Sequence, residues 1–250
     1  MTLFRSLFPV VGFLLSMACI PAVMADRVSV TVSHDLMAAR PAETIVLRFA
    51  EVRARLPDVR LDHVQVRRAD TGAVVAAQVT NFDPDDRRAL YDDLVWQHDF
   101  AAGETSATFL IETTDAPVPP FQSKVFARHV PERLDDFAWE NDRMAHRAYG
   151  PGLDTPAAGK SQMISSGMDY WSKRVRYPIV DRWYLKGHDA YHIDSGEGVD
   201  NYSVGTNRGV GGLGVWHQGA LRPSHNWSTA RVLANGPIRA VVELDYEPWD

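Results

Sequence analysis

Residues 27–33 read RVSVTVS, so that Val28, Val30 and Val32 alternate with polar residues. Strict alternation of this kind is typical of a β-strand with one buried face. Five more short apolar runs follow, separated by turn-forming residues. They are residues 44–49, 63–68, 73–80, 93–98 and 105–112. Helical periodicity is limited to residues 50–56. The pattern predicts a small antiparallel β-sandwich over residues 26–114.

A proline-rich segment, residues 115–121 (DAPVPPF), follows this region. Proline lacks the N–H that a central strand needs, so the segment is predicted to be an extended linker. The composition changes beyond it, because all four lysines and six of the seven tryptophans lie after residue 121. Residues 231–246 (RVLANGPIRAVVELDY) predict a hairpin that turns at Asn235 and Gly236. We therefore expect a second, mainly β domain over residues 122–250.

The first 25 residues have the features of a secretory signal peptide. Arg5 precedes an apolar run over residues 7–20, and small residues stand just before Asp26. The alternative is a lipoprotein signal with lipidated Cys19, but Ser16 occupies the position where that motif normally has leucine. The expected location is secreted or periplasmic, with no membrane span and no cysteine left after cleavage.

Charge and composition exclude several classes of protein. The chain has 26 Lys and Arg against 32 Asp and Glu, a net charge of −6, which gives no general attraction to nucleic acid. The glycine-rich residues 205–214 lack the Lys-Ser/Thr ending of a phosphate-binding loop, so no nucleotide is expected as a partner. The apolar and charged fractions are those of an ordinary globular protein.

Four stretches carry a family resemblance. They are residues 126–150 (FARHVPERLDDFAWENDRMAHRAYG), 165–171 (SSGMDYW), 191–216 (YHIDSGEGVDNYSVGTNRGVGGLGVW) and 232–246 (VLANGPIRAVVELDY). The chain resembles the secreted bacterial family catalogued as domain of unknown function 4861. The resemblance implies a β-sandwich followed by a large supersandwich similar to galactose mutarotases and polysaccharide lyases. Members usually extend beyond this length, so residues 122–250 are expected to form an incomplete supersandwich. Genes of the family tend to accompany enzymes that degrade uronic-acid polysaccharides.

Residues 139–143 combine an aromatic ring with planar polar groups, as sugar-binding sites do. The candidates for substrate binding here are Trp139, Glu140, Asn141 and Arg143. Arg143 is suited to hold a uronate carboxylate in a forked hydrogen bond. The alternative is an internal network in which Glu140 or Asp136 neutralises Arg143. Trp216 is a further candidate, as a platform on which a sugar ring stacks.

Titratable residues are densest over residues 191–208, on glycine-rich backbone that can approach a ligand closely. The predicted catalytic residues are His192, Asp194, Glu197, Tyr202 and Arg208. We expect His192, Glu197, Tyr202 and Arg208 to converge on one cleft, with Trp139 and Arg143 on its wall. The alternative is a solvated loop. The spacing of His188 and His192 also leaves a divalent metal site open, although the glycines argue against the helix that a zinc site of this spacing needs. No other cofactor is expected.

The sequence thus favours a protein that acts on polysaccharides or oligosaccharides containing uronic acid. For a lyase, Arg208 or Arg143 would neutralise the carboxylate, with His192 or Tyr202 as the base and Tyr202 as the acid. A glycoside hydrolase would instead use a carboxylate pair from Asp194, Glu197 and Asp200. The alternatives are a non-catalytic glycan-binding protein and a sugar mutarotase or epimerase, for example with His192 and Glu197.

Overall fold

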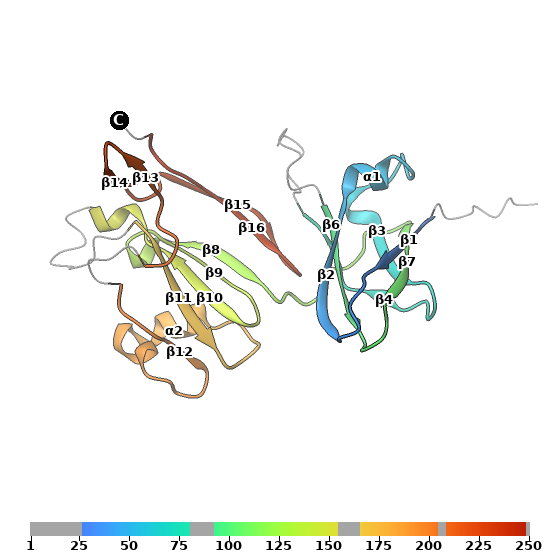
Figure 1. The fold of residues 1–250 in the computed structure, drawn as a ribbon, viewed down its shortest axis with the longest axis horizontal. Helices are drawn as coiled ribbons and strands as arrows, with labels where there is room; N and C mark the ends of the chain where they lie inside the picture. Colours follow the sequence, from blue (N-terminus) through green and yellow to red (C-terminus); the bar gives the residue numbers. More distant parts are fainter. Residues whose placement is uncertain (1–26, 81–92, 155–165, 205–208, 249–250) are drawn as a thin grey trace, which may run out of the picture.

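The computed structural model describes residues 27–80, 93–154, 166–204 and 209–248. The predicted signal peptide, with Cys19, and the predicted catalytic Arg208 lie outside these residues. The described chain consists mainly of antiparallel strands arranged in two parts (Figure 1). No helix within the four described ranges has the length and apolar character needed to cross a bilayer.

The first part contains two facing sheets. One sheet has the order β1 (Arg27–Ser33), β7 (Ser106–Thr113), β3 (Val64–Arg68) and β4 (Val74–Val75). The other has the order β2 (Arg40–Arg48), β6 (Asp93–Phe100) and β5 (Ala77–Val79). A short helix α1 (Phe49–Arg53) follows β2, and a 3-10 turn η1 (Leu61–His63) precedes β3. The predicted β-sandwich is confirmed.

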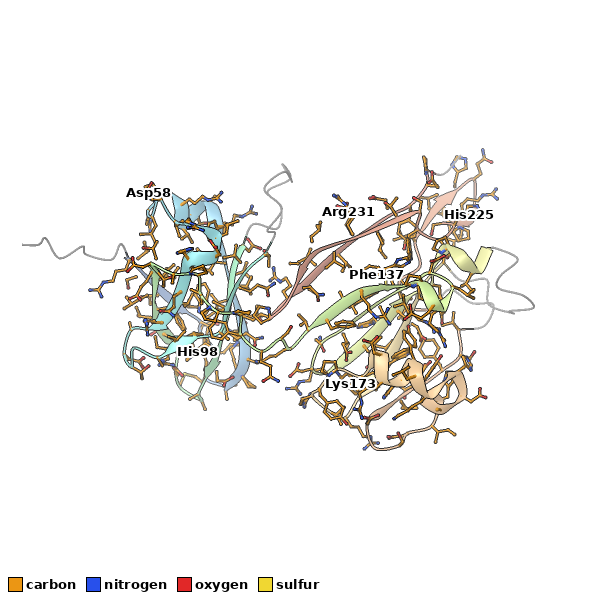
Figure 2. The ribbon with its side chains drawn as sticks, turned by 180° about the vertical axis from the view of Figure 1, so that it is seen from behind. Asp58, His98, Phe137, Lys173, His225 and Arg231 are labelled. Atoms are coloured by element: carbon orange, nitrogen blue, oxygen red, sulfur yellow. The ribbon has the colours of Figure 1, made fainter. Side chains whose placement is uncertain are left out.

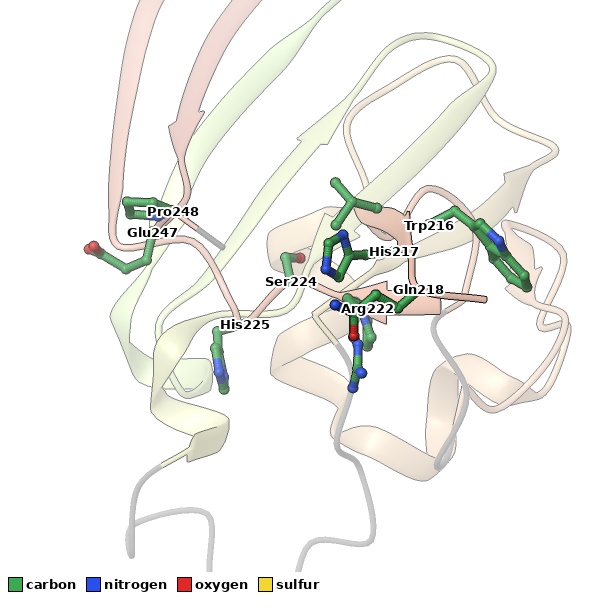
Figure 3. A pocket seen from close by; sticks show the side chains of 10 residues that line it. Trp216, His217, Gln218, Arg222, Ser224, His225, Glu247 and Pro248 are labelled. Carbon is green, nitrogen blue, oxygen red and sulfur yellow. The ribbon is translucent and has the colours of Figure 1, made fainter. Parts of the chain in front are cut away.

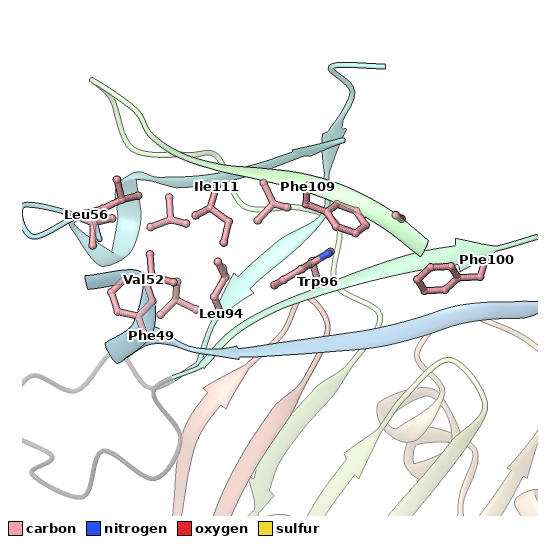
Figure 4. Packing of buried hydrophobic residues seen from close by; sticks show 13 residues of the cluster. Phe49, Val52, Leu56, Leu94, Trp96, Phe100, Phe109 and Ile111 are labelled. Atoms are coloured by element: carbon pink, nitrogen blue, oxygen red, sulfur yellow. The ribbon is translucent and has the colours of Figure 1, made fainter. Parts of the chain in front are cut away.

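The core of this sandwich lies between the two sheets and under α1 (Figure 4). Trp96 of β6 and Phe109 of β7 are fully buried, and their ring centroids lie 5.4 Å apart. Phe49 of α1 is also fully buried. Burying a large apolar side chain of this kind stabilises a fold by about 1.5–3 kcal/mol. The apolar residues that predict the strands are therefore also the residues that form the hydrophobic core.

The second part is built on a five-stranded antiparallel sheet. Its order is β12 (Gly198–Asp200), β11 (Met168–Lys173), β10 (Met144–Ala148), β9 (Asp136–Glu140) and β8 (Phe126–Val130). The short helical segments are η2 (Pro131–Arg133), η3 (Pro151–Asp154), α2 (Val180–Lys186) and η5 (His188–His192). Two hairpins complete this part: β13 (Gly214–His217) with β14 (Ala220–Pro223), and β15 (Thr229–Asn235) with β16 (Ala240–Asp245). A relation to the galactose-mutarotase-like supersandwich stays a prediction.

Both faces of the five-stranded sheet are covered. On one face Trp171 of β11 packs against Trp183 of α2, with ring centroids 5.5 Å apart. On the other face Phe137 of β9 packs in a cluster with Trp227 and residues of β15 and β16 (Figure 2). Since side chains alternate between the faces of a strand, charged residues that share the face of Trp171 are carried into the interior.

The two parts meet at the turn between β15 and β16. The Gln78 side chain accepts hydrogen bonds from the N–H groups of Ile238 and Arg239 and donates one to the Arg239 carbonyl, at 2.9, 2.7 and 2.8 Å. The turn contains Gly236 at φ +88°, a left-handed conformation that suits glycine. The predicted hairpin is present, but Asn235 is the last residue of β15 and pairs with Ala240, so the turn is made by residues 236–239.

Candidate functional site

Three buried charges lie side by side on the sheet face that α2 covers. Asp136, Arg147 and Asp169 come from the adjacent strands β9, β10 and β11, and the register places Arg147 directly opposite Asp169. Their exposed fractions are 3%, 4% and 1%. Moving a charge from water into the protein interior costs free energy unless an opposite charge or a hydrogen bond compensates it. We therefore expect contacts among these three side chains to keep them in place.

Arg147 is the centre of the row. Its NH2 lies 3.3 Å from Oδ2 of Asp169, and its Nε lies 3.5 Å from Oδ2 of Asp136. Its guanidinium carbon also lies 4.5 Å from the centre of the Tyr149 ring, a cation–π contact. The Nε–H is sealed from solvent and has no hydrogen-bond acceptor among the described residues. Arg147 is therefore held by charge contacts with two carboxyl groups rather than by a well-directed hydrogen bond from Nε.

Two carboxyl groups in this region have raised pKa values. Burial raises the pKa of Asp136 to about 6, against the opposing effect of the Arg147 charge. Burial and the nearby Asp169 raise the pKa of Asp200 in β12 to about 6 as well. Carboxyls that titrate near neutral pH are suited to proton transfer, and such groups are commonest in functional sites.

Tyrosine hydroxyls surround the row. The Tyr149 hydroxyl donates a hydrogen bond to Oδ2 of Asp169 at 3.4 Å, and burial raises the pKa of Tyr149. Burial also raises the pKa values of Tyr184 and Tyr202, whose buried hydroxyls have no hydrogen-bond partner among the described residues. These tyrosines remain protonated at neutral pH and can act as hydrogen-bond or proton donors.

A cavity of about 380 Å³ opens onto the row. Its lining comes from η2, β9, β10, η3 and η5, and consists of Glu132, Arg133, Leu134, Asp136, Arg147, Tyr149, Leu153 and His188. We call it the Arg147 cavity. Its size lies within the range of small-ligand sites, and it combines two guanidinium groups with an imidazole, a phenol and carboxyls. This is the arrangement in the described chain with the most apparent capacity for acid–base chemistry on an anionic ligand.

Two of the predicted catalytic residues meet beside this row, around Asp200. Nδ1 of His192 lies 3.3 Å from the Asp200 carbonyl oxygen and 3.5 Å from Oδ2 of its carboxyl. The N–H of Tyr202 donates to Oδ1 of Asp200 at 3.4 Å. His192 and Tyr202 are thus brought together, but neither lines the Arg147 cavity.

Glu197 is tied to α2 and the segment before it. Its Oε1 accepts hydrogen bonds from Tyr177 and Arg182 at 2.8 Å each, and its Oε2 accepts one from Lys186 at 2.6 Å and one from Trp183 at 3.2 Å. The hydrogen bond from Lys186 is the largest of the effects that lower its pKa to about 2. Both oxygens are occupied, so the geometry favours an anchoring role over the predicted catalytic one.

Replacing Glu197 by Gln is expected to remove an acid-dependent share of the protein's stability. Because the folded-state pKa is lowered from 4.5 to about 2, the carboxylate stabilises the fold fully above pH 4.5 and progressively less as the pH falls towards 2. Thermal unfolding across this range should show a steeper loss in the wild type than in Glu197→Gln. Parallel curves for the two proteins would contradict the anchoring role.

Glu140 and Asn141 are also engaged by the scaffold. Glu140 accepts a hydrogen bond from Lys173 at 2.6 Å and hydrogen bonds from the N–H groups of Ile179 and Val180 at the start of α2. Oδ1 of Asn141 accepts hydrogen bonds from the backbone of Arg143 and Met144, which closes the turn between β9 and β10. The geometry therefore favours structural roles for both residues over the predicted sugar binding.

The remaining candidates lie apart from one another. Trp139 faces the β15–β16 side of the sheet and stacks on His146, with centroids 5.3 Å apart. Arg143 is exposed in the β9–β10 turn. Asp194 is bound to Arg174 at 2.8 Å. Trp216 lies on the β13–β14 hairpin, in a different pocket. The expectation of a single shared cleft thus does not match the placement of these side chains.

The same residues bear on the metal site that the spacing of His188 and His192 left open. Nowhere in the described ranges do three His, Cys, Asp or Glu side chains gather so as to hold a metal ion. His188 and His192 do lie close, with ring centroids 4.9 Å apart. Their neighbours Asp194 and Glu197 are instead bonded to Arg174 and to α2, as described above.

Known proteins give the chain a family context. A family model described as "Domain of unknown function (DUF4861)" matches residues 32–250. A relative from Formosa agariphila, "Uncharacterized protein P7", is 32% identical over 226 residues, which cover 88% of this chain and 56% of the relative. The chain therefore spans little more than half the length of that relative. No solved structure matches the chain.

Proposed function

The chain belongs to the family of domain of unknown function 4861, and on that premise we propose that it is an exported carbohydrate-active enzyme that cleaves glycans containing uronic acid. The observation that carries the proposal is the guanidinium group of buried Arg147 in the wall of the Arg147 cavity, beside Asp136 and Tyr149. A uronate carboxylate is an acceptor of matching charge and shape for a guanidinium group. Arg133 in the same wall supplies a second cation.

The groups around the cavity are suited to a lyase reaction. Arg147 and Arg133 would neutralise the carboxylate, which makes the C5–H of the sugar acidic. Asp136, with its pKa of about 6, would take that proton as the base. The C4–O bond then breaks as the C4–C5 double bond forms, and the Tyr149 hydroxyl would protonate the departing oxygen. A glycoside hydrolase would instead use Asp136 and Glu132 as its carboxylate pair.

Incubation of the protein with a panel of uronate oligosaccharides tests the proposal. A lyase produces the ultraviolet absorbance of an unsaturated uronate, whereas a hydrolase produces new reducing ends without it. Binding without either product would make the protein a glycan-binding module. No binding and no turnover across galacturonate, glucuronate, mannuronate and guluronate oligomers would contradict the proposal.

Replacing Asp136 by Asn is expected to lower turnover by about 10²–10⁴-fold, the usual contribution of a positioned base. In the wild type, turnover should rise with pH through about 6, because the base must be deprotonated. The variant should lose this limb of the pH profile. Asp135→Asn is a matched control, since Asp135 is the adjacent residue, lies in a left-handed conformation that Asn tolerates and does not line the cavity.

An unchanged pH profile in Asp136→Asn, with the variant shown to be folded by circular dichroism, would remove Asp136 from the mechanism. Equal losses in Asp135→Asn and Asp136→Asn would indicate damage to the fold and would also contradict the assignment.

A second candidate function is glycan binding without catalysis. The observation that favours it is Trp216, whose side chain is exposed on the β13–β14 hairpin beside polar residues. An exposed tryptophan is a typical sugar platform and needs no acid or base. The panel experiment above separates this candidate from the enzyme.

A further inference from the structure

Most charged groups that line the Arg147 cavity have a counter-charge within the protein. Arg147 lies between two carboxyl groups, 3.3 Å from Asp169 and 3.5 Å from Asp136. Glu132, which also lines the cavity, pairs with Arg128 at 2.6 Å. Because opposite charges in contact offset each other, the protein itself compensates most of the charge at these positions.

Arg133 differs from these residues in its partners. It lines the cavity, but no Asp or Glu of the described ranges forms an ion pair with it. Its charge still acts inside the cavity, because burial raises the pKa of Asp136 and the Arg133 charge is among the effects that oppose this rise. A cation that no protein carboxyl group balances attracts anionic ligands, and the attraction is stronger where solvent is partly excluded. Arg133 therefore offers a positive charge that the carboxylate of a ligand can balance.

Two tyrosines hold the Arg133 side chain. Its guanidinium carbon lies 4.8 Å from the centre of the Tyr184 ring and 5.9 Å from that of Tyr191. Its NH2 group donates a hydrogen bond to the Tyr191 hydroxyl at 2.9 Å, and Tyr191 itself is buried against Trp171. A guanidinium group can stack on an aromatic ring and still use its in-plane N–H donors for a carboxylate. The tyrosines are neutral, so they fix the position of the cation without cancelling its charge.

The backbone that follows Arg133 is closely packed. Leu134 and Asp135 have left-handed conformations, with φ of +55° and +61°. Such a conformation costs a non-glycine residue free energy, so it persists only where the surroundings impose it. A Cβ on Gly152 would lie 2.5 Å from the Leu134 carbonyl oxygen, and one on Gly150 would collide with the Asp135 carbonyl group. This packing fixes the chain beside Arg133, so the cation is in position before a ligand binds.

The arginine of a larger pocket has a different environment. Arg222 lines a pocket of about 720 Å³ beside the β13–β14 hairpin. Trp216 pairs with Leu221 and Arg222 with Val215, so the indole and the guanidinium group lie on opposite faces of the hairpin. Figure 3 shows the Trp216 ring pointing away from Arg222. The hairpin pocket therefore does not repeat the arrangement of rings and cation found at Arg133.

We propose that Arg133 makes the Arg147 cavity selective for uronates with a free, ionised carboxylate and against their methyl esters. This inference rests on the proposed function for its ligand class. Arg147 orients the carboxylate, Arg133 balances its charge, and Tyr191 is a positioning residue for Arg133. A methyl ester carries no charge and has a methyl group on one of the two oxygens, so it leaves the Arg133 cation unbalanced beside the ligand.

Isothermal titration of the full chain at neutral pH tests the selectivity. The ligands are oligomers of galacturonate, glucuronate, mannuronate and guluronate, each as the free acid and as the methyl ester. Wild type is expected to bind at least one free acid about tenfold or more tightly than its ester, as a hydrogen-bonded charge pair implies. Arg133→Gln should lose this preference, because its affinity for the acid falls by about the same factor and its affinity for the ester stays within about twofold of wild type.

Arg143→Gln is the matched control for this variant. It makes the same chemical change in the same part of the chain, but Arg143 is exposed in the β9–β10 turn and does not line the cavity. It should keep the preference of wild type for the free acid.

Tyr191→Phe tests how Arg133 is held. The variant keeps the ring but removes the acceptor of the Arg133 hydrogen bond. We expect its affinity for the free acid to fall by about 2- to 10-fold while its affinity for the ester is unchanged. A merely structural role would weaken the binding of both ligands equally. Tyr246→Phe removes a hydroxyl group from the other face of the sheet and should bind both ligands as wild type does.

Three outcomes would overturn the role of Arg133. The first is equal affinity of wild type for the acid and the ester. The second is an undiminished preference for the acid in Arg133→Gln, with the variant shown to be folded by circular dichroism. The third is an equal loss of preference in Arg133→Gln and Arg143→Gln.

The failure of this role is distinguishable from the failure of the proposed function. Cleavage of the acid and the ester at equal rates would support the proposed function and overturn the selectivity. Binding of the acid that depends on Arg133, without cleavage of any oligomer, would support the selectivity and contradict the enzymatic function. No binding of wild type to any of the free-acid oligomers would overturn both.

Discussion

Replacing Arg147 by Lys is expected to weaken the binding of a uronate oligosaccharide by about 10- to 150-fold. The change keeps the positive charge near Asp136 and Asp169 but removes the planar guanidinium fork. A hydrogen bond to a charged group is worth about 1.5–3 kcal/mol, which corresponds to that loss of affinity. Isothermal titration of wild type and variant with the same oligosaccharide measures it.

Arg231→Lys provides the control for this experiment. Arg231 lies on β15, is 47% exposed and pairs with Glu243, so it tests the same chemical change away from the cavity. The control should bind as wild type. Wild-type affinity in a folded Arg147→Lys variant would contradict the carboxylate-binding role of Arg147.

Replacing Glu140 by Ala is expected to lower the free energy of unfolding by about 3–5 kcal/mol, the usual cost of breaking a buried ion pair. The Glu140 and Lys173 side chains are each only 1% exposed, so the variant leaves the Lys173 ammonium unpaired in the interior. It also removes the acceptor for the first N–H groups of α2. Urea unfolding of both proteins measures the difference.

The matched control is Glu132→Ala. Glu132 also pairs with a cation, Arg128 at 2.6 Å, but its side chain is 58% exposed. Exposed ion pairs contribute about 0–1 kcal/mol, so this variant should unfold nearly as wild type does. Glu140→Ala combined with Lys173→Met should recover much of the loss, because no buried charge then remains. A loss below about 1 kcal/mol in Glu140→Ala would contradict the structural assignment.

The N-terminal sandwich was predictable because its strands are short apolar runs separated by turn-forming residues, and β1 alternates apolar and polar residues throughout. Val28, Val30 and Val32 face the core, as the pattern requires. The existence of the β15–β16 hairpin was predictable because Asn235 and Gly236 separate two apolar runs, although the observed turn is residues 236–239 and not a two-residue Asn-Gly turn. In both cases the local sequence preference and the tertiary environment agree, and the element follows from the sequence alone.

The central sheet of the second part was harder to predict from sequence. On the face of the sheet that α2 covers, the buried residues of β9 are Asp136, Ala138 and Glu140, and those of β11 include Asp169 and Trp171. Charged residues at core positions conceal the alternation that would identify a strand. The sequence indicates Asp136 only as a neighbour for Arg143, and it does not distinguish Arg147, Tyr149 or Asp169 from the residues around them. Charged residues of opposite sign at every second position of neighbouring strands were the sequence feature that could have indicated this buried row.

A high density of titratable residues in the sequence does not by itself show which of them meet in a functional site. Glu197 and His192 stand close in sequence, yet one binds α2 and the other binds Asp200. Arg147 and Asp169 are distant in sequence, and strand register alone places them face to face. Register is set by the packing of whole strands, which a single sequence does not reveal.

The most direct test of the account is a crystal structure of the protein with a bound uronate oligosaccharide. We expect the sugar carboxylate to lie in the Arg147 cavity, beside the guanidinium groups of Arg147 and Arg133, with Asp136 facing the C5–H. An oligosaccharide bound elsewhere, with no carboxylate in the cavity, would contradict the proposed function.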